Sequence, residues 1–426
     1  MYPAGTAKSC SATASERDRD RMTDTLKPQS AKDVEDAVGW ALAEGKTLEV
    51  AGQATKRGLG RPSQSDFTLD LSALSGVTLY EPEELVLSAK AGTPIAEIEA
   101  LVAEKGQELA FEPLDYGPIL GLKAGAGTIG GVLAANLSGP RRIKAGAARD
   151  HFLGVTAVSG RGETFKSGGR VVKNVTGYDL CKLLSGSFGT LAVMTDVTIK
   201  TLPKSETEQT VAVIGLEDDT AAGPMAAAMG SSCDVSGAAH LPSHVFRRFE
   251  GLDPAHAATV FRLEGVKPSV KHRTDVLSTL LRAFGAVEVI GETQSRALWR
   301  GIRDAAPFAA VADGHDRPLW RISTEPGKGF DLSEMISPGA QMFYDWGGGL
   351  IWILMPPADD AGAAELRQAV ATLGGHATLV RASTSLRAAT DVFQPQDAAV
   401  AALTKRVKES FDPKGILNPG RMWAGV

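Results

Sequence analysis

The sequence predicts an α+β protein of more than one domain, and three observations support this prediction. The chain has 426 residues, whereas a single domain typically has about 100 to 200. Short apolar runs with the spacing of strands and of helices alternate along it. Glycine-rich turns interrupt these runs at residues 52–58, 125–131 and 186–189. Such turns suit a domain that holds an extended ligand along several loops.

Composition excludes several classes of function. The net charge is −5 and no long basic run occurs, so nucleic acid is not expected as the main partner. No stretch approaches the ~20 apolar residues of a membrane helix, and we expect a cytoplasmic protein without a transmembrane segment. Cys10, Cys181 and Cys233 are widely spaced, so neither a disulfide framework nor an iron–sulfur or zinc site is expected.

The first 25 residues are rich in Ser, Thr, Ala and mixed charge. They carry too little apolar surface to offset the entropy of ordering. We therefore expect residues 1–25 to form a disordered tail, with Met22 as the natural start of the chain.

The elements that follow have recognisable signals. Ser30 caps a helix over 31–44 that Gly45 ends, and Thr93 caps a second helix with Pro94 at its first position. A short helix is expected from Leu180 onward. Strands are expected over 48–51, 67–71, 85–89, 155–159, 164–166 and 191–200.

The turn 52–58 comes directly after a strand, so several of its backbone N–H groups can converge on one anion. Lys56 and Arg57 add positive charge beside it. Its glycines lack the G-x-G-x-x-G spacing of a dinucleotide-binding crossover, and no helix pattern follows. A solvated hairpin turn is the alternative interpretation.

The stretch 125–154 contains a second candidate anion site. Residues 128–131 open a short apolar helix, whose free N–H groups and dipole would favour an anion such as a diphosphate by about 0.3–1 kcal/mol. The glycines at 127, 130, 131 and 139 allow close approach. A tightly packed helix–strand corner is the alternative.

From about residue 205 strands and helices alternate regularly, which indicates a second domain. Helices are expected over 270–284, 294–303 and 361–373, and another around 397–411. Strands are expected near 211–214, 260–263, 287–290, 320–323, 343–346 and 350–354.

Several strings, in this order, resemble a known family. They include T-I-G-G-V-L-A (128–134), S-G-P-R-R (138–142), K-N-V-T-G-Y-D-L (173–180), G-S-F-G-T-L (186–191), D-W-G-G-G-L-I-W (345–352) and F-D-P-K-G-I-L-N-P-G-R-M (411–422). Together they resemble the PCMH-type FAD-binding proteins of the vanillyl-alcohol oxidase and p-cresol methylhydroxylase superfamily. Within it, they are most similar to the FAD-binding E subunits of bacterial glycolate oxidase (glycolate dehydrogenase). The resemblance covers nearly the whole chain after Met22.

The resemblance implies a two-lobed fold. Residues 26–205 would form the PCMH-type FAD-binding domain and residues 206–380 a ferredoxin-like cap domain over the flavin ring. Residues 381–426 would return to the FAD domain through the helix around 397–411 and the tail 418–421.

The resemblance also implies that the FAD diphosphate lies between the turns 52–56 and 127–131, with its adenine end near residues 189–193. Superfamily members that link flavin covalently often use a histidine of the first turn, but the first histidine here is His151. We therefore expect non-covalent FAD. The implied cofactor-binding residues are Gly52, Gln53, Ala54, Thr55, Lys56, Gly127, Thr128, Ile129, Gly130, Gly131, Asn136, Gly139, Gly189, Thr190 and Val193.

Candidate catalytic residues are few. Oxidation of glycolate needs a cation for the carboxylate and a base for the hydroxyl proton, and Arg321, His376 and Arg381 are candidates, with structural or surface roles as the alternative. Catalytic D-2-hydroxy-acid dehydrogenases of the superfamily carry a metal-binding G-D-G-N-x-H string, which this sequence lacks. Pro242 between His240 and His244 disfavours a metal pair. No metal site is expected.

The leading hypothesis is an FAD-binding subunit of a multi-subunit glycolate oxidase that converts glycolate, a small 2-hydroxy acid, to glyoxylate. Its partners would be a catalytic flavoprotein subunit and an iron–sulfur subunit, with peripheral membrane association through the complex left open. A self-sufficient FAD-dependent dehydrogenase and a scaffold with a vestigial flavin site are the alternatives. Trp346, Ile351 and Trp352 are candidates for a partner-covered surface, or for the chain's own core.

Overall fold

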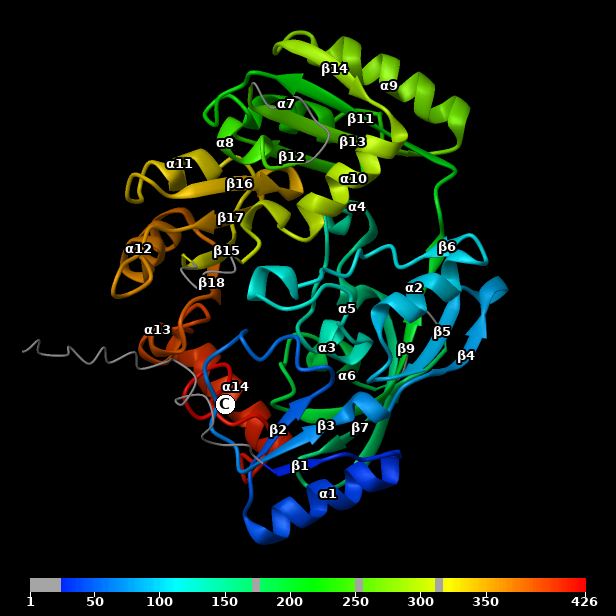
Figure 1. The fold of residues 1–426 in the computed structure, drawn as a ribbon, viewed down its shortest axis with the longest axis vertical. Coiled ribbons are helices and arrows are strands. Elements are labelled where there is room, and N and C mark those ends of the chain that lie inside the picture. The colour runs from blue at the N-terminus through cyan, green and yellow to red at the C-terminus, as the bar shows by residue number, and fades with distance from the viewer. Residues whose placement is uncertain (1–23, 171–176, 250–255, 311–316) are drawn as a thin grey trace, which may run out of the picture.

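The computed structural model describes residues 24–170, 177–249, 256–310 and 317–426, which form two lobes of mixed helix and strand (Figure 1). Met22 and residues 1–23 of the expected tail lie outside the described residues. Asp24 and Thr25, which we expected in the tail, belong to strand β1 (Asp24–Leu26). This strand pairs in parallel with β3. The three residues of β1 are too few to show the alternation of a strand, so the strand could not be recognised without its distant partner β3.

The lower lobe contains two main sheets (Figure 1). One has three parallel strands in the order β1-β3-β2, and the other has five antiparallel strands in the order β4-β5-β9-β7-β8. The remaining strand bounds are β2 (Leu48–Ala51), β3 (Phe67–Asp70), β4 (Val77–Glu81), β5 (Val86–Lys90), β6 (Gln107–Glu108), β7 (Phe152–Ser159), β8 (Thr164–Gly168), β9 (Ala192–Lys200) and β10 (Leu202–Pro203). The helices are α1 (Ala31–Glu44), α2 (Ile95–Ala103), α3 (Ile129–Ala134), α4 (Arg142–Ala145), α5 (Ala148–His151) and α6 (Leu180–Leu184).

Helix starts in this lobe follow the sequence in one case and depart from it in another. Ser30 and Asp33 form a complete capping box at the start of α1, and Gly45 ends the helix with a φ of 63°, which confirms both expected signals. At α2 the residue before the helix is Pro94 and not Thr93. The Thr93 hydroxyl instead donates to the Lys90 carbonyl at 2.7 Å, and this hydrogen bond closes the turn after β5.

The upper lobe is built on one eight-stranded sheet, in the order β14-β11-β13-β12-β16-β17-β15-β18. Two of its strands, β12 and β18, were not expected from the sequence. In β12 the residues are G-A-A-H-L and all of them are buried, so it lacks the alternation that marks a half-exposed strand. The strands are β11 (Thr207–Ile214), β12 (Gly237–Leu241), β13 (Ala258–Gly265), β14 (Ala286–Ile290), β15 (Leu319–Ser323), β16 (Gln341–Asp345), β17 (Leu350–Leu354) and β18 (His376–Arg381).

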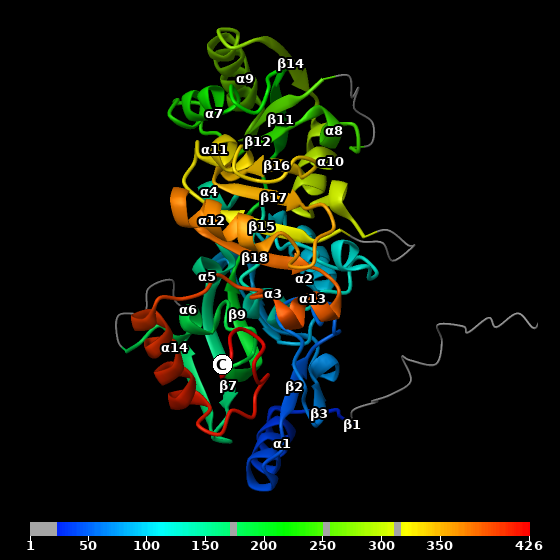
Figure 2. The same cartoon turned by 90° about the vertical axis from the view of Figure 1, so that its left-hand side faces the viewer.

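Helices cover both faces of this sheet (Figure 2). Alternation along β11 sends Val211 and Val213 into the cluster with α9, whereas Ala212 packs in the cluster that contains Trp299 of α10. The helices are α7 (Ala222–Met229), α8 (Ser243–Phe246), α9 (Lys267–Leu281), α10 (Glu292–Arg303), α11 (Gly329–Ser333) and α12 (Ala363–Leu373).

The three hydrophobic residues weighed as a partner surface are all buried in the chain's own core. Trp346 is 7% exposed, Ile351 is fully buried and Trp352 is 1% exposed. The core alternative is therefore correct for these side chains. Separately, no helix in the described parts of the chain is both long and apolar enough to cross a membrane.

The C-terminal segment leaves the upper lobe after β18 and runs through α13 (Thr384–Ala389) and α14 (Ala398–Phe411) back to the lower lobe (Figure 2). There Leu48 N–H donates to the Ile416 carbonyl at 2.7 Å, and Asn418 N–H donates to the Leu48 carbonyl at 2.9 Å. The chain end thus pairs with β2, the strand that leads into the turn 52–58.

A buried ion pair anchors this segment. The Lys408 ammonium lies 2.8 Å from the Asp412 carboxylate and donates to the carbonyls of Thr190 and Leu417. Asp412 in turn accepts from the N–H groups of Ile416 and Leu417 at 3.0 and 2.8 Å. The pair therefore holds the end of α14 and the following turn against the lower lobe.

Replacing Lys408 by Met should lower the free energy of unfolding by about 3–5 kcal/mol, because it leaves the buried Asp412 carboxylate without its cation. Lys405→Met is the matched control: Lys405 is exposed and lies 3.9 Å from Glu409, so its loss should cost under about 1 kcal/mol. Urea denaturation followed by circular dichroism measures both values. Equal losses in the two variants would contradict the anchoring role.

Candidate functional site

A groove lies between the end of β2 and the start of α3. It consists of two adjoining cavities of about 80 and 70 Å³ that share Val50, Gly52, Thr128, Gly131 and Phe188. These residues come from three separate turns and a strand. The turns 52–58 and 125–131, which the sequence marked separately as anion sites, therefore meet in space.

Glycine is needed where the two turns touch. A Cβ atom on Gly52 would lie 2.7 Å from Thr128 Oγ1, and one on Gly131 would lie 3.3 Å from Lys56 Nζ. Side chains at these two positions would fill the space between the turns. The glycines thus keep the groove open by removing side chains, as the sequence indicated.

The N-terminus of α3 does not offer free donors, which corrects our expectation for this turn. Ile129 N–H donates to the Thr93 carbonyl at 2.9 Å, Gly130 N–H donates to the Ala91 carbonyl at 2.8 Å, and Gly131 N–H donates to Thr128 Oγ1 at 3.3 Å. The acceptors at 91 and 93 follow β5, and only the folded chain brings them to α3. Gly130 also packs on Ala91, where a Cβ would lie 2.8 Å from the carbonyl oxygen.

The first turn supplies the free donors instead. Among the described residues, none accepts a hydrogen bond from the backbone N–H groups of Gln53, Ala54 or Thr55. Ala54 has a left-handed φ of 56°. A left-handed residue in such a turn helps successive N–H groups to point at one anion.

Lys56 places an ammonium in this groove, where the lining carboxylate of Glu49 pairs instead with Arg57. Its ammonium contacts Thr55 Oγ1 at 3.4 Å, and it forms no ion pair within the described part of the chain. Burial lowers the pKa of Lys56 to about 8, and the more distant Asp115 opposes this shift. An anionic ligand beside this partly buried amine would favour its charged form.

The C-terminal tail completes the groove. Asn418 accepts from Val50 N–H at 2.8 Å and donates to the Phe188 carbonyl at 2.7 Å. Arg421 donates to the Lys56 carbonyl at 2.5 Å. Asn418 and Arg421 were not among the expected site residues, although the N-P-G-R string in the tail was the available signal.

Nine of the expected cofactor residues line the groove. These are Gly52, Gln53, Ala54, Thr55, Lys56, Thr128, Gly130, Gly131 and Gly189. Gly127 lies beside it, since a Cβ there would be 3.8 Å from Lys56 Nζ.

The other five expected residues have side chains or contacts elsewhere. Ile129 and Val193 are fully buried in the core. For Val193 the reason is alternation along β9, which turns Ala192 and Met194 toward the second cavity. The hydroxyl of Thr190 donates to the Ser187 carbonyl. The side chain of Asn136 accepts from Arg149 N–H, and Gly139 packs against Glu112. We therefore leave these residues out of the groove.

A second cluster gathers cations around Trp346. The guanidinium carbons of Arg142 and Arg321 lie 4.4 and 4.8 Å from the centre of the Trp346 ring, whose N–H donates to the Gly139 carbonyl. Neither arginine forms an ion pair with a carboxylate in the described parts of the chain. His376 lies nearby, and its pKa is lowered by partial desolvation and then by Arg321 and Arg142. Arg321 and His376 were among the catalytic candidates from the sequence, and Arg142 was not.

The third catalytic candidate has a structural role. Arg381 is 8% exposed and donates to the carbonyls of Ile119 and Phe308, both at 2.8 Å. Its charge holds segments of both lobes together and does not face an open space. These contacts favour the structural alternative for Arg381, and they could be seen only once the neighbours of β18 were known.

His240 is also used structurally. Its ring lies fully buried between the Thr259 hydroxyl at 2.9 Å and the Asp218 carboxylate at 3.2 Å. The described residues contain no group of three or more His, Cys, Asp or Glu side chains placed to hold a metal ion.

Comparison with known proteins identifies the family to which the chain belongs. A sequence model of the FAD binding domain matches residues 25–168, and one of the C-terminal domain of FAD-linked oxidases matches residues 393–422. The glycolate oxidase subunit GlcE of Escherichia coli (strain K12) is 32% identical over 389 residues, which cover 91% of this chain and 95% of that protein. The chain belongs to the GlcE family.

Other relatives of this GlcE-family chain are more distant. The glycolate oxidase subunit GlcD of Bacillus subtilis (strain 168) is 24% identical over 85% of this chain and 80% of that protein. The solved structure of p-cresol methylhydroxylase with substrate bound superposes with a TM-score of 0.70 at 13% identity, over 93% of this chain and 88% of that one. The mixed α+β fold expected from the resemblance is thereby confirmed.

The two matched segments of the GlcE-family chain are the ones that meet in the groove. The FAD-binding match includes both turns, and the C-terminal match includes Asn418 and Arg421. The groove is therefore assembled mainly from these two segments, and Phe188, Gly189, Ala192 and Met194 come from the stretch between them.

Lys56→Met should weaken FAD binding at least about tenfold, because it removes the one unpaired ammonium from the groove. In the wild type, affinity should fall as pH rises above about 8, where Lys56 of the free protein loses its proton. The variant should lack this pH dependence. Flavin fluorescence titration measures both.

Lys123→Met is the control, since Lys123 is exposed and lies in the same lobe outside the groove. Its affinity and pH profile should match the wild type. A Lys56→Met protein that binds FAD with unchanged affinity would place the diphosphate elsewhere. Gly130→Val is a poorer probe, because the contact with Ala91 would disturb folding as well as binding.

Proposed function

We propose that this chain is the FAD-binding subunit of a multi-subunit glycolate oxidase that converts glycolate to glyoxylate. Electrons would pass from it to partner subunits, namely a catalytic flavoprotein subunit and an iron–sulfur subunit. The observation that carries the proposal is the 32% identity with a glycolate oxidase subunit over 91% of the chain. The lack of a closely spaced cysteine set in the sequence agrees with a cluster on another subunit.

The groove residues fit the FAD diphosphate. In this proposal the N–H groups of residues 53–55 and the Lys56 ammonium bind the phosphate oxygens, and Gly52 and Gly131 leave room for them. The adenine end would follow the second cavity, past Gly189, Ala192 and Met194. The free ammonium of Lys56 supports this assignment, because burying it without a ligand costs free energy.

The proposed attachment of FAD is non-covalent. The residues that line the two cavities of the groove include no His, Cys or Tyr, the side chains best suited to bond a flavin. His151, the first histidine of the chain, is buried and contacts the Ala145 carbonyl.

The bound flavin would supply the two-electron acceptor for oxidation of the substrate C–H bond. For the substrate itself, Arg142 and Arg321 present unpaired cations that suit a carboxylate, and the lowered pKa of His376 suits a proton acceptor. This cluster is the observation that favours the second candidate, a self-sufficient FAD-dependent 2-hydroxy-acid dehydrogenase. A scaffold with a vestigial flavin site is less well supported, because the Lys56 ammonium and the free N–H groups of the first turn would then have no ligand to bind.

Acid precipitation of the purified, flavin-loaded chain should release the yellow flavin into the supernatant, because no covalent bond holds it. Absorbance and fluorescence of the two fractions measure the partition. Flavin that stays in the pellet after washing in denaturant would contradict non-covalent attachment.

The isolated chain should bind FAD but not reduce an artificial electron acceptor with glycolate or D-lactate. Reduction should begin when it is co-expressed with its partner subunits, as measured by steady-state dye reduction. Turnover by the isolated chain would overturn the subunit proposal in favour of the self-sufficient dehydrogenase. Arg142→Ala, Arg321→Ala and His376→Ala would then be the variants to compare, with Arg381→Ala expected to disturb folding.

A further inference from the structure

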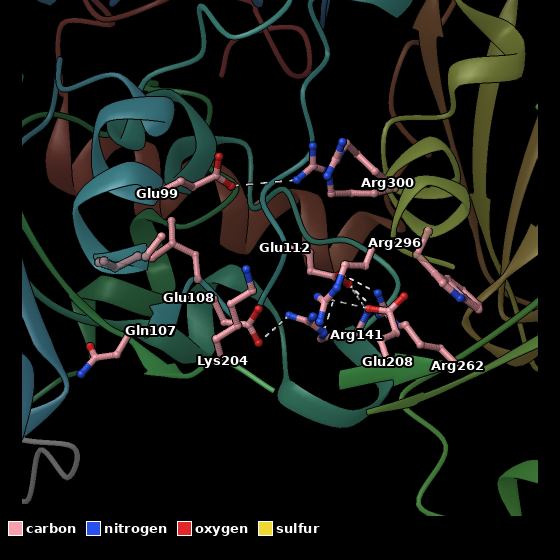
Figure 3. Close-up of a pocket in the computed structure, with 15 residues that line it drawn as sticks. Glu99, Gln107, Glu108, Glu112, Arg141, Lys204, Glu208, Arg262, Arg296 and Arg300 are labelled. Carbon is pink, nitrogen blue, oxygen red and sulfur yellow. Dashed lines mark hydrogen bonds and ion pairs between the residues drawn. The ribbon is translucent and has the colours of Figure 1, made fainter. Parts of the chain in front are cut away.

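Paired charges close the joint between the two lobes. Arg262 donates to both oxygens of Glu112 at 2.8 and 3.0 Å, and Arg141 lies 2.9 Å from Glu108 (Figure 3). None of these four residues lines the groove. An effect of a bound ligand on the fold is therefore expected first in the segments that line the groove itself.

The C-terminal tail, residues 412–426 after α14, is one of these segments, and its residue Asn418 connects two others. The Asn418 side chain accepts from Val50 N–H at 2.8 Å and donates to the Phe188 carbonyl at 2.7 Å. Val50 belongs to the strand that leads into the first turn, and Phe188 belongs to the turn that contains Gly189. Asn418 is only 2% exposed, so its amide is committed to these two partners and not to water.

Three residues that line the groove have a left-handed backbone although they are not glycine. The φ angle is 56° at Ala54, 53° at Phe188 and 42° at Asn418. This region is sparsely populated by residues with side chains, and such residues persist where the surrounding contacts hold them. Because the Asn418 amide donates to the Phe188 carbonyl, the tail supplies one of the contacts that maintain the shape of the groove.

Glycine lies where the tail approaches the rest of the groove most closely. A Cβ atom on Gly189 would lie 2.7 Å from Asn418 Nδ2, and one on Gly60 would lie 3.1 Å from the Arg421 carbonyl oxygen. Arg421 also donates to the Lys56 carbonyl. The tail therefore contacts both the turn that carries the proposed phosphate donors and the turn at the other end of the groove.

We propose that Asn418 is a positioning residue that couples FAD binding to docking of the C-terminal tail. It acts through its neighbours, because it holds the strand before the first turn and the turn at Phe188 in one arrangement. FAD would bind well only while the tail is docked, and bound FAD would stabilise the docked tail by the same factor. This inference rests on the proposed FAD site.

The test is limited trypsin digestion of the full chain with and without FAD. Lys414 is an exposed trypsin site in the tail that lines neither cavity of the groove. Cleavage there requires local opening, because the N–H of the nearby Ile416 is hydrogen-bonded to Asp412. Mass spectrometry of the peptide 415–426 measures the rate, at trypsin concentrations where the rate is proportional to trypsin. Flavin fluorescence titration measures the dissociation constant of FAD.

FAD should slow cleavage after Lys414 in the wild type. The factor is one plus the ratio of free FAD to its dissociation constant, which is about a hundredfold at ~100 times that constant. Cleavage after Arg282, which is exposed in the upper lobe and lies outside the groove, should not respond to FAD. FAD binding without any protection of Lys414 would overturn the coupling and leave the proposed FAD site intact.

Asn418→Gly tests the residue itself, because glycine keeps the left-handed backbone and removes both side-chain hydrogen bonds. The variant should bind FAD about tenfold or more weakly, and its Lys414 should be cleaved faster without FAD. Asp234→Gly is the matched control, since Asp234 has a φ of 54° and lies in the upper lobe outside the groove. It should match the wild type in both measurements.

The remaining outcomes also decide the question. Faster cleavage of Asn418→Gly with unchanged affinity for FAD would overturn the coupling, because it would show that Asn418 only holds the tail. A wild type that binds no FAD would overturn this inference together with the proposed FAD site.

Discussion

The buried ion pairs between the lobes are the constraint on which the rest of the structure depends. Arg262 binds Glu112, whose backbone φ is 50°, and Arg141 donates to both oxygens of Glu264. Against the desolvation that would raise it, Arg262 and Arg141 lower the pKa of Glu264 to about 2. The ionised Glu264 carboxylate therefore stabilises the fold at pH values above its unfolded-state pKa of about 4.3. This stabilisation is lost as the pH falls toward the folded-state pKa. These ion pairs hold the lobes together at neutral pH, because removing either partner would leave an uncompensated buried charge.

This constraint gives two adjacent arginines different roles. Arg141 is used in the network, whereas the next residue, Arg142, begins α4 and stacks on Trp346 of the upper lobe. Trp346 is held in turn by its hydrogen bond to the Gly139 carbonyl. The string S-G-P-R-R thus contributes one ion pair and one cation–aromatic contact between the lobes. Its two arginines therefore contact the upper lobe and do not line the groove.

Charges without partners separate the candidate binding places from the structural ones. Lys408 and Arg381 are buried, but each donates hydrogen bonds to carboxylate or carbonyl oxygens. Lys56 and Arg321, by contrast, have no ion-pair partner in the parts of the chain that are described. Because desolvating a cation costs free energy that an opposite charge or good acceptors offset, the unpaired state of these two cations supports the proposed anion-binding places.

The sequence by itself determined many of the local elements and the family. The capping of α1 by Ser30 depends on residues close together in the chain, and the glycines of the turns at 52 and 131 are visible in the sequence itself, so these patterns were readable. Only the tertiary structure decided which donors at those turns stay free. The N–H groups of α3 are used by carbonyls after β5, and Asn418 reaches the groove from the far end of the chain. Such contacts join residues that no local pattern relates, because folding brings them together only through the packing of whole elements.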